Sequence, residues 1–212
     1  MNTILEELDE PEADVSELVI PFTAITFCPD CGHVDDVLET LRNSPCKTCG
    51  LVCDTRCNLF GAEQVDLLQT IFECFRSTTS KLCVLLFCAL MERHLSNLLF
   101  GRCRRIGIDW QIIDFLLDRY WKFDQRVRLF RQLIDLPAEK VFTDTETKSI
   151  FDSYGVLRQK RNMLAHSLPG SSYCIERSEI RQAVQLAAES FSAFALLHHQ
   201  YCSLDSPGLP VN

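Results

Sequence analysis

The chain has 212 residues, a formal net charge of −8 and 47% apolar residues. This length accommodates one ordinary domain and a small module, and the apolar fraction supports a packed core, which excludes a disordered chain. The acidity is uneven, because residues 61–212 carry 17 acidic and 18 basic side chains. The global charge therefore does not exclude a nucleic-acid partner for the C-terminal part.

The N-terminal segment, residues 1–20, is predicted to be an acidic arm. It contains seven carboxylates and no lysine or arginine. This composition is typical of a solvated tail or a short helix, and a partner-binding arm is the alternative. The segment lacks the basic start and apolar stretch of a secretory signal. Several of the twelve cysteines also lie on apolar helical faces, which favours a reducing, cytoplasmic setting over a secreted disulfide scaffold.

Residues 21–60 are predicted to form a small β-type module that binds zinc. Two Cys-x2-Cys pairs, Cys28 with Cys31 and Cys46 with Cys49, are separated by 14 residues. Four thiolates suit a tetrahedral Zn²⁺ ion, and a complete set of protein ligands indicates a structural zinc ribbon. Unmetallated redox pairs are the alternative. The nearby residues interpreted as spare thiols and a surface histidine are Cys53, Cys57 and His33.

From residue 61 onward, apolar residues recur at helical spacing. This predicts an all-α bundle over residues 61–205 and a short tail over 206–212. The first part is predicted to be one long helix or a broken pair that ends at Gly101. Its most apolar run, residues 82–91, is half the roughly 20 residues that span a bilayer, so a buried helix is expected and no membrane partner.

Helix boundaries after Gly101 are predicted from capping residues. The N-terminal signals are Asp109, Asp124 and the capping box Thr143 with Glu146. The helix after that box is expected to end near Ser167, and the last helix to begin near Ser178. The buried stripe predicted for the last helix is Ile180, Val184, Ala187, Phe191, Phe194, His198 and Tyr201.

The penultimate helix ends in the stretch RQKRNMLAH, residues 158–166. Arg158, Asn162 and His166 are four residues apart and share one helical face, which the long Arg161 side chain can also reach. The helix dipole favours a protonated imidazole in the last turn. These residues are predicted to form an anion site, with phosphate as the anion.

Within this stretch, Arg161 to His166 reads R-N-x3-H. This resembles the R-polar-x3-H signature of the HEPN superfamily, small all-α bundles of which many are metal-independent ribonucleases in toxin–antitoxin, CRISPR-linked and antiphage systems. The resemblance covers residues 61–205 by architecture and six residues by sequence. It implies that Arg161 neutralises the scissile phosphate, that His166 is the general acid or base, and that Asn162 orients one of them. It also implies a homodimer with a composite cleft.

The predicted function is a metal-independent endoribonuclease that uses the RNA 2′-OH as nucleophile. An inhibitory or activating protein partner is a further expectation. HEPN toxins with nucleotidyltransferase antitoxins often carry a tyrosine where this chain has Leu168, so regulation by AMPylation is not expected. The alternative is a non-catalytic dimeric adaptor whose ribbon binds nucleic acid or a protein. A zinc-dependent enzyme is disfavoured, because four thiolates leave no open metal position.

Other polar residues are predicted to support this site. Arg158 shares the motif face, and Glu92 is a carboxylate on an otherwise apolar helix that faces the motif or, alternatively, pairs with Arg93 at the surface. The residues that line an RNA path or, alternatively, a solvated face are Arg102, Arg104, Arg105, Arg119, Tyr120, Trp121, Lys122, Arg126, Arg128 and Arg131.

Overall fold

The computed structural model describes residues 4–10, 14–23, 25–28, 34–35, 45, 49–50, 57–134, 145–166 and 174–202. These residues are mostly helical, as predicted for an all-α chain. The helices are α1 (Ile4–Asp9), α2 (Val15–Thr23), α3 (Ala62–Arg76), α4 (Leu82–Arg105), α5 (Trp110–Arg119), α6 (Phe123–Ile134), α7 (Thr145–His166) and α8 (Arg177–Cys202).

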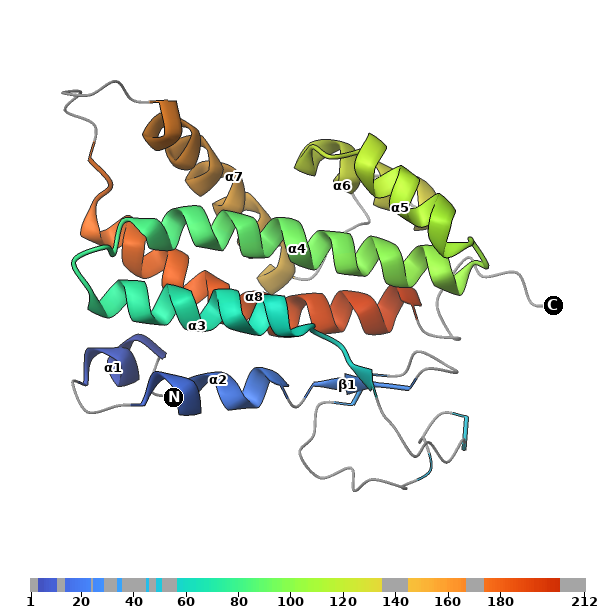
Figure 1. Cartoon of the computed structure of the whole chain (residues 1–212), viewed down its shortest axis with the longest axis horizontal. Helices are drawn as coiled ribbons and strands as arrows, with labels where there is room; N and C mark the ends of the chain where they lie inside the picture. The colour runs from blue at the N-terminus through green and yellow to red at the C-terminus, as the bar shows by residue number, and fades with distance from the viewer. Residues whose placement is uncertain are drawn as a thin grey trace.

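Helix α4 lies at the centre of the bundle, alongside α8 and α3, with α5, α6 and α7 on its other side (Figure 1). Its buried face includes Val84, Phe87 and Leu95, each fully enclosed. Among the described helices, α4 alone is long and apolar enough to cross a membrane, but 56% of its most apolar window is buried inside the bundle. That burial agrees with the predicted core helix.

The first long apolar segment is a broken pair of helices, one of the two predicted arrangements. The expected end at Gly101 is wrong, because α4 continues through it to Arg105. A Cβ at Gly101 would lie 2.6 Å from Nε2 of His198, so the glycine permits close approach of α8. The helix ends at Arg105, and Gly107 follows with a φ of 81° in a Schellman motif, in which Ile108 N–H donates to the Cys103 carbonyl at 2.9 Å.

Two capping predictions have different outcomes. Asp109 caps α5, since its carboxylate accepts from Gln111 N–H at 2.9 Å. Asp124 lies inside α6, which begins at Phe123, and does not occupy the expected N-cap position. Thr143 lies outside the described residues, as does the Glu146 side chain. The last helix begins one residue before the predicted Ser178, and its predicted apolar stripe is buried throughout.

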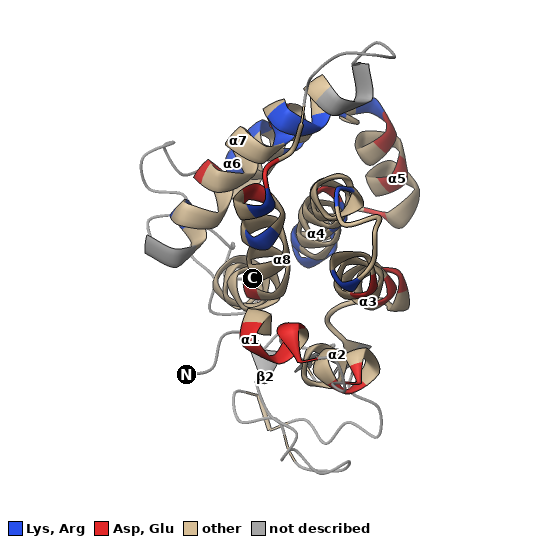
Figure 2. Cartoon of the chain, turned by 90° about the vertical axis from the view of Figure 1, so that its left-hand side faces the viewer, with Lys and Arg blue, Asp and Glu red and all other residues tan. Residues whose placement is uncertain are grey.

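The N-terminal segment packs against the bundle. Leu5 and Leu8 of α1 and Val19 of α2 join the hydrophobic core. The Asp9 carboxylate pairs with Arg181 of α8 at 2.9 Å. Helix α1 contacts α3 and α8, and α2 contacts α3. The acidic segment thus lies along the α3 and α8 side of the molecule (Figure 2).

A small antiparallel sheet follows α2. Its strands are β1 (Thr26–Phe27), β2 (Val34–Asp35) and β3 (Cys57–Asn58), in the order β2-β1-β3. Ile25 before the sheet and Leu59 and Phe60 after it belong to the same core as the bundle. The predicted zinc-ribbon segment therefore starts and ends against the helices.

Candidate functional site

The predicted motif lies in the last two turns of α7. Arg161 is half-buried, and the side chain of Asn162 is exposed. His166 is the last residue of the helix, and its side chain lies outside the described residues. The helix C-terminus contributes a partial negative charge at this end, which stabilises cations.

Glu92 of α4 reaches the motif. Its Oε1 accepts from Nη2 of Arg161 at 3.2 Å and from the Tyr154 hydroxyl at 3.5 Å. Arg93, the alternative partner of Glu92, instead pairs with Glu63 at 2.7 Å. Two residues 69 positions apart thus meet at one point, which local sequence spacing does not specify.

The Arg161–Glu92 pair is partly open to solvent. The side chain of Arg161 is 31% exposed and that of Glu92 is 36% exposed. The Nε atom of Arg161 is buried and has no acceptor within the described part of the chain. A guanidinium has five N–H donors in a planar fork. The carboxylate therefore orients the Arg161 fork through Nη2, and Nε is enclosed.

The other cations of the RQKRNMLAH stretch also bind carboxylates. Arg158 donates to both oxygens of Asp124 on α6, at 2.7 Å each, and this pairing holds the pKa of Asp124 below its usual range. Lys160 pairs with Glu179 of α8 at 2.9 Å and lowers the pKa of that carboxyl. The three cations thus connect α7 to three different helices; a Glu92 side chain that faces the motif was one of two predicted alternatives, and the pairs with Asp124 and Glu179 were not predicted.

One residue of the proposed RNA path has a different role. Arg102 is 1% exposed and donates to the main-chain carbonyls of Leu133 and Tyr201, at 3.0 and 2.9 Å. It thereby caps the C-terminal turns of α6 and α8. Both predicted placements of Arg102, on an RNA path and on a solvated face, are wrong, because its side chain is buried.

Arg126 is held in a similar way. Its Nε donates to the Tyr120 carbonyl at 2.9 Å and its Nη2 to that of Leu117 at 3.2 Å, so it caps α5. Its Nη1 donates to Ser96 of α4. The basic residues of this group that are exposed are Arg104, Arg119, Lys122 and Arg128. Figure 2 shows the contrast between basic residues around α6 and α7 and acidic residues on α5.

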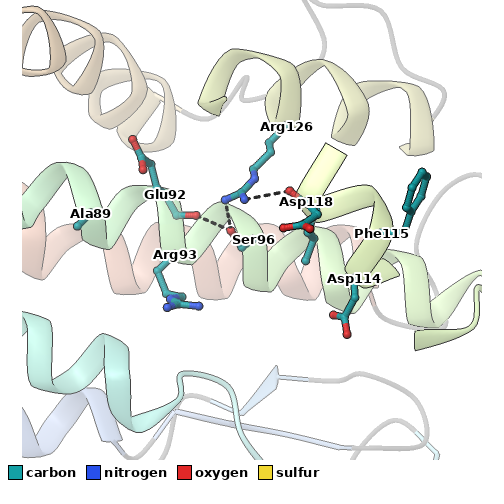
Figure 3. Close-up of a pocket in the computed structure, with 9 residues that line it drawn as sticks. Ala89, Glu92, Arg93, Ser96, Asp114, Phe115, Asp118 and Arg126 are labelled. Carbon is teal, nitrogen blue, oxygen red and sulfur yellow. Dashed lines mark hydrogen bonds between the residues drawn. The ribbon is translucent and has the colours of Figure 1, made fainter. Parts of the chain in front are cut away.

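A pocket of about 690 Å³ lies between α4, α5 and α6 (Figure 3). Glu92 and Ser96 line it from α4, Phe115 and Asp118 from α5, and Arg126 from α6. Glu92 belongs both to this pocket and to the Arg161 pair. The pocket and the motif are therefore adjacent.

Two of the predicted zinc ligands lie close together. Sγ of Cys28 and Sγ of Cys49 are 3.9 Å apart, which is too far for a disulfide of about 2.05 Å. Tetrahedral ligands with Zn–S bonds of about 2.3 Å place their sulfurs about 3.8 Å apart. Cys31 and Cys46 lie outside the described residues. Among the residues that are described, no group of three or more metal-binding side chains is found.

The buried histidines are structural. Nδ1 of His94 lies 2.9 Å from Nε2 of Gln64, whose Oε1 accepts from Gly61 N–H. Nδ1 is therefore the acceptor, which leaves the proton on Nε2. Burial lowers the pKa of His94 to about 3 and that of His198 to about 4. Both imidazoles are neutral at pH 7, as expected for packed core residues.

The chain was also compared with known proteins. No family model matches it, and neither a search of curated proteins nor a search of solved structures returns a match.

Proposed function

We propose that this chain is a HEPN-like, metal-independent endoribonuclease that cleaves RNA by attack of the 2′-OH on the adjacent phosphate. The observation that carries the proposal is the Arg161–Glu92 pair, at 3.2 Å and partly exposed. An arginine fork oriented by a carboxylate, beside the exposed Asn162 and one turn before His166, suits the recognition of a phosphate.

The proposed chemistry assigns one role to each motif residue. Arg161 stabilises the charge on the phosphorane, where fixed cationic donors give large rate effects. His166 takes the 2′-OH proton or protonates the leaving 5′ oxygen. Asn162 orients the phosphate or the imidazole. The products are a 2′,3′-cyclic phosphate and a 5′-OH, and DNA is inert because it lacks the nucleophile.

The resemblance to HEPN ribonucleases extends the proposal to a homodimer with two motifs in one cleft. It also suggests a toxin or antiphage setting in the cytoplasm, with a protein partner that restrains or activates the enzyme. These features rest on the resemblance of Arg161 to His166 and its place at the end of α7.

The zinc ribbon is proposed as a structural module. The Sγ–Sγ distance of 3.9 Å between Cys28 and Cys49 fits two ligands of one tetrahedral ion. Cys31 and Cys46 would complete the set, and zinc would then fold the segment between α2 and α3. We expect one zinc per chain by metal analysis, and its loss in Cys28→Ser. A full complement of zinc in that variant would contradict the ligand set.

The test of the nuclease proposal is an RNA-cleavage assay with product-end analysis. The wild type is compared with Arg161→Ala and His166→Ala, and Lys160→Ala is the matched control, since Lys160 lies on the same helix but pairs with Glu179. We expect cleavage that resists a mild chelator, leaves cyclic phosphate ends and disappears only in the two motif variants.

Two results would contradict the proposal. One is full cleavage by Arg161→Ala or His166→Ala, which would place the active site elsewhere. The other is no cleavage of pooled cellular RNA by a wild type that is monomeric, since the composite cleft needs two copies. The adaptor alternative is favoured by the exposed Trp110, Ile112 and Phe115 on α5. It predicts a stable dimer without nuclease activity.

A further inference from the structure

The pocket between α4, α5 and α6 shares Glu92 with the proposed active site (Figure 3). Its volume of about 690 Å³ lies within the range of small-molecule sites. Glu92 lies at one end of the pocket, so a group that occupies this end lies next to a phosphate bound at Arg161. On the proposed function, the nearest such group is a base that flanks the scissile phosphate.

The inner wall of this pocket is formed by Arg126, which is fixed by hydrogen bonds. Arg126 spans from α6 to α4 and uses three nitrogens, on the carbonyls of Tyr120 and Leu117 and on the Ser96 hydroxyl. Figure 3 shows it crossing to Ser96. Burial lowers the pKa of Arg126, but its guanidinium remains charged at pH 7. A wall with fixed hydrogen-bonding groups can select one ligand orientation.

The opposite wall, on α5, combines an aromatic ring with two carboxylates. Phe115 is 67% exposed, so its ring is open to a ligand in the pocket. Asp114 and Asp118 also line the pocket and are exposed. Neither has an ion-pair partner among the residues that the structure describes.

We infer that this pocket binds a single nucleobase and favours bases that carry an exocyclic amino group: cytosine, adenine and guanine over uracil. The inference rests on the proposed function for its placement beside the cleaved bond. The Phe115 ring offers a stacking surface, as aromatic side chains do for unstacked RNA bases. The carboxylates of Asp114 and Asp118 accept from an amino group, as Asp and Glu do from cytosine N4.

Uracil is disfavoured because its O4 is an acceptor and would face a carboxylate oxygen. The pocket fits a base better than a simple ammonium ion. An ammonium ion would use only the carboxylates, whereas the pocket also presents an aromatic ring and a fixed guanidinium. The pocket is thus a specificity site for the base, and Arg161 is the site for the phosphate.

The inference is tested with nucleoside monophosphates, which contain no bond for the nuclease to cleave. Binding of CMP, AMP, GMP and UMP to the full chain is measured by NMR titration. We expect CMP to bind about tenfold more tightly than UMP. Phe115→Ala should weaken CMP binding several-fold, and Asp118→Asn should reduce the preference for CMP, because an amide can donate to uracil O4.

The control variant is Phe100→Ala, which removes an aromatic ring of α4 that is 38% exposed and lies outside the pocket, and it should leave binding unchanged. Spermidine is titrated as a cation without a base. Three results would overturn the inference. These are equal affinity for CMP and UMP, unchanged CMP binding in Phe115→Ala, and displacement of CMP by spermidine when neither Phe115→Ala nor Asp118→Asn changes CMP binding. Base-selective binding by a monomeric wild type that does not cleave RNA would keep the pocket and reject the nuclease proposal, so the two failures are distinguishable.

Discussion

Helices α4 and α7 both end in a group of basic residues, and the two groups do different work. At the end of α4, Arg102 is buried and donates to main-chain carbonyls of α6 and α8. Near the end of α7, Arg158 and Arg161 are partly exposed and pair with carboxylates of α6 and α4. Arg102 holds helix ends together, Arg158 is held by both oxygens of Asp124, and Arg161 makes a single contact of 3.2 Å with Glu92.

The difference follows from how each helix is packed. Helix α4 is surrounded by α3, α5, α6, α7 and α8, whereas α7 packs against α4 and α8. An arginine on the buried face of a surrounded helix must satisfy its donors inside the protein, because an unpaired buried charge is costly, whereas Arg104 of the same helix is exposed. An arginine on a peripheral helix can keep donors near solvent. Burial therefore decides which basic residues are free for chemistry.

The largest effect is expected on activity. Arg161→Ala should lower RNA cleavage by about 100- to 1,000-fold, as for loss of one transition-state donor. Its free energy of unfolding should fall by less than about 1 kcal/mol, since a partly exposed ion pair contributes little. Cleavage kinetics and urea denaturation measure the two quantities. If the loss of activity were explained by a lower fraction of folded protein, Arg161 would be a structural residue like Arg102.

Arg102→Ala should show the opposite pattern. It removes hydrogen bonds to the Leu133 and Tyr201 carbonyls and leaves a buried gap, at a cost of about 3 kcal/mol in the free energy of unfolding. Chemical denaturation measures this cost. Cleavage by the fraction that remains folded should be close to that of the wild type. Stability within about 0.5 kcal/mol of wild type would show that the caps are dispensable.

The next largest effect is expected from acid, which should lower the free energy of unfolding through His94 on the buried face of α4. Burial lowers the pKa of His94 from 6.5 in the unfolded chain to about 3, so its contribution to stability is present above pH 6.5 and is lost as pH falls. Between pH 7 and pH 5 this residue alone should cost about 2 kcal/mol. Unfolding at both pH values measures the change. An imidazolium signal of His94 above pH 5 in NMR spectra would contradict it.

The smallest effects on the free energy of unfolding are expected for Gly101 of α4 and Gly155 of α7, and they should have opposite signs. Gly101→Ala places a Cβ against His198 in α4 and should cost about 1–2 kcal/mol. Gly155→Ala in α7 meets nothing within 4 Å and should stabilise by about 0.5–1 kcal/mol, because alanine favours the helix. Melting temperatures of the pair give the comparison. A stabilising effect of both substitutions would contradict the close packing of α4 against α8 at Gly101.

Several features were predictable because they are local. Asp109 caps α5 by accepting a hydrogen bond from the N–H of Gln111, only two residues away. The stripe of α8 is buried because helical spacing places its members on one face. Asp124 failed as a cap because its carboxylate binds Arg158, 34 residues away. Gly101 does not end its helix. Its lack of a Cβ instead makes room for His198, which is far along the chain.

The sequence by itself determined the helical class of the chain, the buried stripe of α8 and the composition of the R-N-x3-H stretch. Helical periodicity depends on neighbours three and four residues apart, so these features are written in short segments. Only the tertiary structure decided that Glu92 meets Arg161 and that Arg102 is buried. Such pairings depend on how distant helices pack, because burial and the position of a partner charge are properties of the assembled core.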